Sequence, residues 1–134
     1  MQQPIIYLIT SGATNAQTTP ANEEFVEILK LIADAVAAKV SLIQLREKNL
    51  SGRVLFELTT QAAQLTRGSQ TLLLVNDRAD IARAGGADGV HLTTSSLSAD
   101  VVRRAFGPNF LIGVSTHSVV EAQAARATGA DFAV

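Results

Sequence analysis

Two cations and two amides follow an apolar segment in SLIQLREKNLSG, residues 41–52. Gln44, Arg46 and Lys48 are spaced two residues apart, so an extended chain would direct these three side chains to the same side. Arginine and lysine bind phosphate groups through charge-assisted hydrogen bonds. The spacing therefore predicts a site for a phosphate or diphosphate, with Glu47 pointing the other way in a structural role. A solvated surface loop is the alternative.

Short polar segments follow four further apolar segments, at residues 10–12, 76–78, 91–96 and 115–118. Asn76 and Asp77 provide oxygen atoms that could bind Mg²⁺, a cation that often shares its ligands with phosphate. The same pair could instead form an Asx turn that caps a helix. His91, inside the apolar segment GVHL, is expected to be a hydrogen-bonded, partly buried side chain rather than a catalyst. His117 could do no more than orient its loop.

Hydrophobic patterning predicts that strands and helices alternate along the chain. The predicted strands are residues 5–10, 42–45, 71–75, 89–92, 111–114 and a last one from 131. The predicted helices run from an Asn22 cap to residue 36, from a Ser51 cap to about Gly68, over 79–84, over 100–106, and from a capping box of Ser118 and Glu121 to Gly129. The first strand is apolar throughout and is expected to be buried on both faces.

Alternating strands and helices indicate right-handed βαβ units and a parallel sheet. Ligands bind such sheets at the carboxyl ends of the strands, where the five polar segments would meet. An internal repeat supports this organisation, since GGADGV at 85–90 returns as TGADFAV at 128–134. An open doubly wound sheet and part of a (β/α)₈ barrel both fit. The length favours the first, and an apolar last strand with no covering helix favours the second.

The composition excludes several classes of protein. At 134 residues and 17% charged, the chain is expected to form a single globular domain over residues 1–134. Its net charge of −1 gives no reason to expect a nucleic-acid or membrane-surface binder. The absence of cysteine excludes disulfides and thiolate metal sites. The first ten residues lack the basic and long apolar regions of a signal peptide, so a cytoplasmic location is expected.

Three motifs, QLREK, VNDRADIARAGGADGVHL and IGVSTHSVVEAQAARATGAD, closely resemble the thiamine-phosphate synthase family, which includes the TenI-like thiazole tautomerases. The motifs occur in the family's order and extend over nearly the whole chain. The resemblance implies a (β/α)₈ TIM barrel, of which this chain would hold about five and a half βα units. It also implies a transferase of thiamine biosynthesis, which joins hydroxymethylpyrimidine diphosphate to thiazole phosphate and releases diphosphate.

The same resemblance implies roles for individual residues. The residues expected to bind the pyrimidine diphosphate are Gln44, Arg46, Lys48, Asn76 and Ser115. Asp77 is expected to bind Mg²⁺. Lys48 and Ser115 are also the expected catalytic groups, because catalysis would consist largely of stabilising the departing diphosphate. Other expected partners are small phosphorylated substrates and further copies of the chain, since family members are often dimers.

One position departs from the synthase pattern and keeps two alternatives open. Ser96 stands where the synthases carry the aspartate that is the second Mg²⁺ ligand, and a hydroxyl is a poorer ligand than a carboxylate. This change favours a TenI-like isomerase, in which His117 would be the catalytic acid and base. A non-catalytic protein that binds a phosphorylated ligand is the other alternative. The later strands of the family barrel, which hold the thiazole phosphate, are not in these residues, so the 134-residue chain is expected to be inactive alone.

Overall fold

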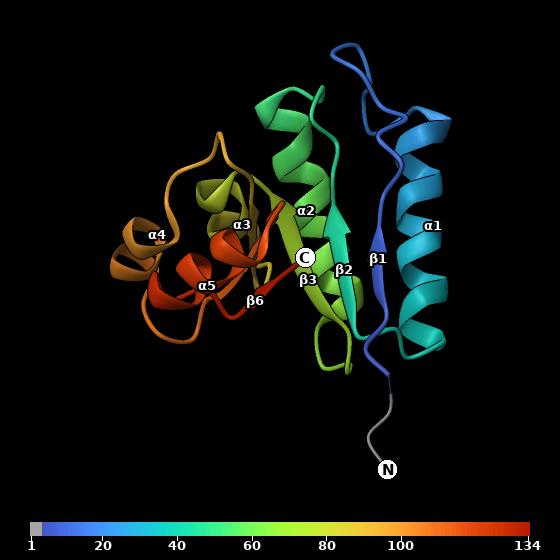
Figure 1. The fold of residues 1–134 in the computed structure, drawn as a ribbon. Helices are drawn as coiled ribbons and strands as arrows, with labels where there is room; N and C mark the ends of the chain where they lie inside the picture. Colours follow the sequence, from blue (N-terminus) through green and yellow to red (C-terminus); the bar gives the residue numbers. More distant parts are fainter. Residues whose placement is uncertain (1–3) are drawn as a thin grey trace.

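The computed structural model describes residues 4–134, in which six strands alternate with five helices. The strands are β1 (Tyr7–Ile9), β2 (Leu42–Leu45), β3 (Leu72–Asn76), β4 (Gly89–Leu92), β5 (Leu111–Val114) and β6 (Phe132–Ala133). The helices are α1 (Glu23–Ala37), α2 (Gly52–Thr66), α3 (Ala79–Gly85), α4 (Ala99–Phe106) and α5 (Val119–Ala127). Figure 1 shows the loops after β1 and β2 at the same end of the sheet, its carboxyl end.

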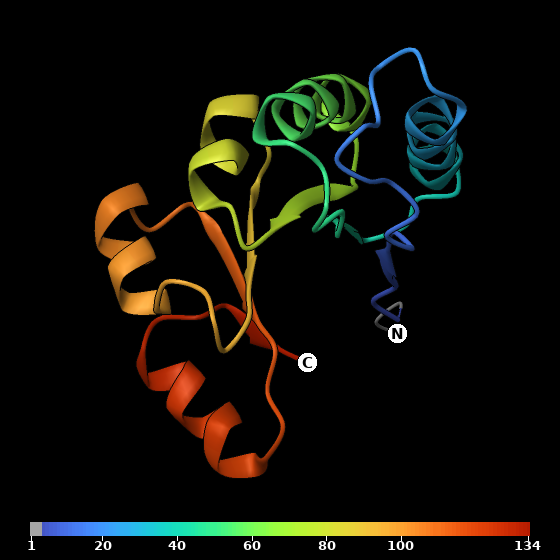
Figure 2. The ribbon, with the colours of Figure 1, turned by 90° about the horizontal axis from the view of Figure 1, so that it is seen from above.

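The strands of the described region form one parallel sheet in the order β1-β2-β3-β4-β5-β6. An open doubly wound sheet would reverse its strand order at a switch point, and this sheet does not. Seen from above, the strands curl and the helices lie on the convex outside (Figure 2). The architecture is therefore a curled half-barrel of the TIM-barrel type, as predicted.

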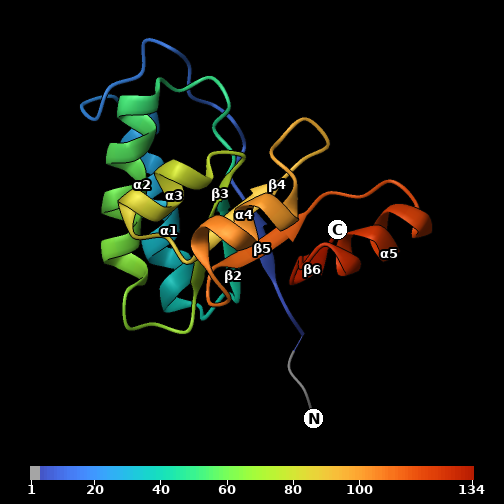
Figure 3. The ribbon, with the colours of Figure 1, turned by 90° about the vertical axis from the view of Figure 1, so that its left-hand side faces the viewer.

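The hydrophobic core lies between the sheet and its outer helices. The strand residues that contribute to it alternate along each strand: Ile43, Leu45, Leu73, Val75, Val90, Leu92 and Ile112. Phe25, Ile28 and Ile32 of α1 and Leu55 and Leu58 of α2 pack against them, and Figure 3 shows α1, α2 and α3 on one side of the sheet. The intervening strand residues, which include Gln44, Asn76 and His91, therefore face the concave side.

The repeated Ala-Asp pair has the same structural function in both copies. Asp88 accepts a hydrogen bond from the amide of Leu73 through Oδ2 (2.7 Å), and its own amide donates to the carbonyl of Leu73 (2.8 Å). Asp131 makes the equivalent two bonds with Ile112, both of 2.7 Å. In each copy the aspartate ties the start of a strand to the strand before it, which accounts for the sequence repeat.

All three predicted N-cap positions are confirmed, but only two of them have a side-chain capping bond. Ser51 accepts from the amide of Val54, and Ser118 accepts from the amide of Glu121. Glu121 does not complete the capping box, because its carboxylate accepts a hydrogen bond from the backbone amide of His117 and not from that of Ser118. Asn22 makes no capping bond in the described structure; its Oδ1 accepts from the amide of Thr19 (2.6 Å), which orders the preceding turn.

The expectation that the first strand is buried on both faces is wrong. Ile5, Ile6 and Ile9 are 77%, 54% and 44% exposed, and the strand is limited to Tyr7–Ile9. The reason is its position: among residues 4–134, β1 pairs with β2 alone and lies at the edge of the sheet. As to membranes, none of the helices described in residues 4–134 has the length and hydropathy of a membrane span.

Gly89 is predicted to be essential for the close approach of β4 and β5. A Cβ built on Gly89 would lie 1.9 Å from the carbonyl oxygen of Leu111 and 2.6 Å from its Cβ, so the strands would have to separate. We expect Gly89→Ala to lower the free energy of unfolding by about 3 kcal/mol or more, measured by urea denaturation.

The matched control is Gly52→Ala at the start of α2, where a Cβ would meet no atom closer than 3.6 Å. That variant should be as stable as the wild type or more stable by up to about 1 kcal/mol, because alanine favours a helix more than glycine does. A Gly89→Ala protein as stable as the control would contradict the tight pairing of β4 with β5.

Candidate functional site

A polar cavity of about 320 Å³ lies at the carboxyl ends of β2, β3 and β4. Its lining residues are Leu45, Glu47, Lys48, Leu50, Leu55, Asn76, Asp77, Arg78, Thr93 and Ser95. Of the residues predicted to bind ligand or metal, the cavity thus brings Lys48, Asn76 and Asp77 together. Its size is in the range of small-molecule sites.

Asp77 holds the backbone between β3 and α3 in an uncommon conformation. Its φ is 67°, in the left-handed region that aspartate tolerates better than most residues. Its amide donates to the carbonyl of His91 at the end of β4 (2.8 Å), which extends the β3–β4 pairing by one residue. The alternative that the Asn76–Asp77 pair caps α3 is not supported, because the N-cap residue is Arg78 and the described structure shows no side-chain capping bond there.

Asn76 supplies an oxygen atom without a partner. Among the described residues, its buried Oδ1 accepts no hydrogen bond, and Asn76 lines the same cavity as Asp77, its neighbour in the sequence. Amide and carboxylate oxygens are ligands that suit Mg²⁺. No group of three or more His, Asp or Glu residues in the described region is arranged to hold a metal. The chain thus offers a partial set of oxygen ligands, which fits a cation that is also bound by phosphate and water.

Ser96, which stands where a second carboxylate was expected, is engaged within its own loop. Its Oγ accepts from the amide of Thr93 (2.9 Å) and lies 3.1 Å from Thr93 Oγ1. Ser95, not Ser96, lines the cavity. The loop after β4 is therefore folded by its own hydroxyl groups and presents no carboxylate to the cavity.

The residues of the predicted phosphate site on β2 are divided between two places. Lys48 lines the cavity, whereas Gln44 is buried on the concave face of the sheet. Arg46 is exposed just beyond the end of β2 and is near enough to His91 for its charge to affect that imidazole. The two cations thus flank the carboxyl end of β2, but the strand ends at Leu45 and its regular alternation does not continue through them.

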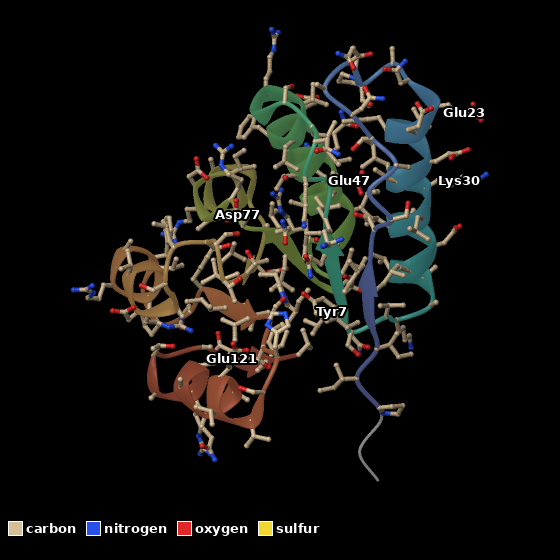
Figure 4. The ribbon with its side chains drawn as sticks, turned by 45° about the horizontal axis from the view of Figure 1, so that its top comes forward. Tyr7, Glu23, Lys30, Glu47, Asp77 and Glu121 are labelled. Carbon is tan, nitrogen blue, oxygen red and sulfur yellow. The ribbon has the colours of Figure 1, made fainter. Side chains whose placement is uncertain are left out.

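Glu47 joins the loop after β1 to the end of β2. Its buried carboxylate accepts from Thr10 Oγ1 (2.6 Å), the amide of Gly12 (3.0 Å), the amide of Thr14 (3.2 Å) and Thr14 Oγ1 (2.6 Å). Figure 4 shows Glu47 between β1 and β2. The predicted structural role of Glu47 is confirmed: it holds the β1–α1 loop at the rim where Arg46 and Lys48 emerge.

Four polar side chains form a chain of hydrogen bonds across the concave face. Gln44 Nε2 donates to the Tyr7 hydroxyl (2.8 Å), which lies 2.7 Å from His91 Nδ1, and His91 Nε2 lies 2.9 Å from Ser115 Oγ. Burial, and secondarily the charge of Arg46, lower the pKa of His91. Burial raises the pKa of Tyr7 to about 12, although the bond from Gln44 acts in the opposite direction. At neutral pH the chain therefore consists of uncharged groups.

The expectation that His91 is a hydrogen-bonded and at least partly buried side chain is confirmed, since both ring nitrogens have partners and the residue is buried. His117 lies elsewhere. Its exposed ring is paired with Glu121 at the start of α5, at 3.3 Å, and is not among the groups that line the cavity. The structure thus brings Lys48, Asn76 and Asp77 to one cavity, links Gln44 to Ser115 on the concave face, and leaves His117 apart.

Tyr7 is the residue of the site that the sequence reasoning missed. It lies within the apolar run IIYLIT, whose pattern predicts a strand and gives the tyrosine no role of its own. Its hydroxyl group was the available signal, because a phenol in a predicted buried strand needs a hydrogen-bond partner. Tyr7 lies on the concave face of the sheet, where its hydroxyl contacts Gln44 and His91.

The fold and the cavity together define a class: a (β/α) barrel-type protein with a cavity at the carboxyl ends of its strands, where proteins of this type bind their ligands. The thiamine monophosphate synthase family model matches residues 6–134. The chain therefore belongs to the thiamine monophosphate synthase family.

Individual relatives agree with this assignment. The chain is 41% identical over 132 residues to a putative thiamine-phosphate synthase 2 of Aquifex aeolicus, covering 98% of this chain and 66% of the relative. It is 47% identical over 106 residues to a putative thiamine-phosphate synthase of Geobacter sulfurreducens, covering 79% and 50%. The structure resembles a thiamine phosphate pyrophosphorylase from Pyrococcus furiosus, with a TM-score of 0.79, 31% identity and coverage of 96% and 58%. The chain thus spans about half to two thirds of the length of these proteins.

Glu47 is predicted to stabilise the fold through its charge. Each carboxylate oxygen accepts from a backbone amide as well as a hydroxyl, so either orientation of a glutamine would place its NH₂ group against an N–H donor. We expect Glu47→Gln to lower the free energy of unfolding by about 3 kcal/mol. Amide hydrogen exchange over residues 10–14 should become faster.

Glu57→Gln is the control, because Glu57 is an exposed residue of α2 bonded only to the side chain of Gln61 among the described residues. It should change stability by no more than about 0.5 kcal/mol. Equal effects of the two substitutions would show that the Glu47 bonds do not hold the loop.

Proposed function

We propose that the chain carries the diphosphate-binding part of a thiamine-phosphate synthase site, and that the protein acts as the transferase that joins hydroxymethylpyrimidine diphosphate to thiazole phosphate. The observation that carries the proposal is the cavity at the ends of β2, β3 and β4, which Lys48, Asn76 and Asp77 line together, and in which Asn76 has a buried amide oxygen with no partner among the described residues. Such a set suits a magnesium-bound diphosphate better than an uncharged or cationic ligand.

The residues would act mainly by electrostatics. Lys48 and Arg46 would bind the diphosphate oxygens and stabilise the negative charge that grows as the diphosphate departs. Ser115 would donate a hydrogen bond to the same group, and Gln44, whose buried Oε1 has no partner among the described residues, could accept from a donor on the pyrimidine. Positive charge placed in advance at the leaving group lowers the barrier without any covalent step by the protein.

Asn76 and Asp77 would hold the metal ion. Both residues line the cavity, and phosphate oxygens and water would complete the coordination. Bound Mg²⁺ would neutralise part of the charge of the departing diphosphate. Ser96 is hydrogen-bonded within its own loop, and both carboxylate oxygens of Glu47 already accept hydrogen bonds from the β1–α1 loop. Among the residues that line the described cavity, Asp77 therefore supplies the carboxylate that could bind the ion.

A TenI-like thiazole isomerase is the second candidate. It is favoured by the lack of a carboxylate at Ser96 and by the exposed pair of His117 and Glu121, which could exchange a proton with a bound thiazole. Proton transfer on a thiazole does not need Mg²⁺, whereas the synthase reaction would depend on it. A non-catalytic protein that binds a phosphorylated ligand would bind diphosphate and show neither activity. Self-association and a cytoplasmic location remain predictions from the family resemblance.

Lys48 is predicted to bind diphosphate. Lys48→Met keeps most of the side-chain length and removes the charge, so the Kd for inorganic diphosphate should rise about tenfold or more, measured by isothermal titration calorimetry with Mg²⁺ present. Lys30→Met on the outer face of α1 (Figure 4) is the control for net charge and should bind as the wild type does. Equal affinity of the Lys48 and Lys30 variants would contradict the assignment of the cavity.

Asp77 is predicted to couple Mg²⁺ to diphosphate. In the wild type, Mg²⁺ should tighten diphosphate binding, and Asp77→Asn should reduce this enhancement about tenfold because a neutral amide is a weaker ligand than a carboxylate. Asp34→Asn, at an exposed position of α1, is the control. If Mg²⁺ strengthens binding to the Asp77→Asn variant as much as to the control, Asp77 does not hold the ion.

A further inference from the structure

The hydrogen-bonded chain on the concave face connects four strands that are distant in the sequence. Gln44 belongs to β2, Tyr7 to β1 and His91 to β4, and Ser115 follows β5. The three links are 2.8, 2.7 and 2.9 Å long, all within the range of good hydrogen bonds. The chain ends at Ser115, which directly follows β5 at the carboxyl end of the sheet and does not line the cavity of Lys48, Asn76 and Asp77.

The direction of the chain follows from its first donor. The Gln44 amide nitrogen can only donate, so the Tyr7 oxygen accepts from it and directs its own proton to His91 Nδ1. The raised pKa of Tyr7, about 12, keeps the phenol proton in place at neutral pH. His91 is then an acceptor at Nδ1, and as a neutral imidazole it carries its one proton on Nε2. That proton is donated to Ser115 Oγ.

The rings that form the chain are held by packing. Phe132 of β6 meets Tyr7 edge to face, with centroids 5.6 Å apart at 84°, and its ring centroid is 6.1 Å from that of His91. Gly113 allows this arrangement, because a Cβ there would lie 2.4 Å from the Phe132 ring. The His91 ring contacts Tyr7, Phe132 and Ser115, and the charge of the Arg46 guanidinium acts on it as well.

We propose that Tyr7 and His91 are positioning residues that fix Ser115 as a hydrogen-bond donor to an anionic phosphate oxygen. Because Ser115 Oγ accepts from His91 Nε2, its own hydroxyl proton is free to be donated outward. In the opposite arrangement the hydroxyl proton would be used up on His91 and a lone pair would face the anion, which repels it. This inference rests on the proposed function, in which Ser115 faces the diphosphate.

The ring tautomer of His91 tests the direction of the chain without any ligand. The chain has two histidines, so a long-range ¹H–¹⁵N spectrum of the labelled protein contains two imidazole patterns, and the His117→Asn variant identifies the one of His91. We expect a neutral ring with the proton on Nε2, and in Tyr7→Phe a mixture of tautomers, because the donor to Nδ1 is lost. A proton on Nδ1 in the wild type, or an unchanged tautomer in Tyr7→Phe, would overturn the proposal.

Binding of inorganic diphosphate tests the consequence for Ser115. His91→Leu and Ser115→Ala should each raise the Kd about fivefold, as expected for one hydrogen bond, and the double variant should be no weaker than either. His91→Gln should restore most of the affinity, because its amide nitrogen can donate to Ser115 from a similar place. Additive effects, or no rescue by glutamine, would overturn the positioning role. Wild-type protein that binds no diphosphate would instead overturn the proposed function, whatever the His91 tautomer.

Discussion

Parallel pairing of β2, β3 and β4 in register decides which side chain of each strand faces the helices and which faces the concave side. Gln44 is opposite Leu74, and Asn76 is opposite His91, so the carboxyl ends of the three strands are aligned with one another. The aliphatic residues between them make the core with the outer helices. A shift of the register by one residue would turn the polar side chains toward the helices and the aliphatic side chains toward the concave face. The cavity and the hydrogen-bonded chain both depend on this pairing.

Two kinds of polar interaction depend on this pairing of the strands. Glu47 and Asp77 act on the backbone: the first holds the loop after β1, and the second continues the pairing of β3 with β4. Tyr7 and His91 act on other side chains and carry the direction of hydrogen bonding from β2 to the end of β5. The first kind fixes the shape of the rim, and in our proposal the second determines which groups on it can donate to an anion. The proposed phosphate site therefore depends on the local arrangement of side chains, since the net charge of the chain is only −1.

Much of the fold could be predicted because the signals are local. The strands at 42–45, 89–92 and 111–114 have the predicted bounds, and the Ala-Asp repeat marks two equivalent turns. What could not be predicted depends on contacts distant in sequence. Tyr7 and His91 are 84 residues apart and meet only because the sheet curls. The exposure of β1 likewise depends on its place in the sheet. For Ser96, the lost carboxylate was visible in the sequence, but the turn that engages its hydroxyl was not.

In the proposed function, the cavity at the ends of β2, β3 and β4 binds a metal-complexed diphosphate. A crystal structure of the protein grown with inorganic diphosphate and Mn²⁺, an ion of similar ligand preference whose anomalous signal can be located, tests it most directly. We expect an anomalous peak beside Asp77 and Asn76, with diphosphate oxygens in contact with Lys48. Metal and diphosphate bound at another place, with the cavity residues in contact with neither, would contradict it.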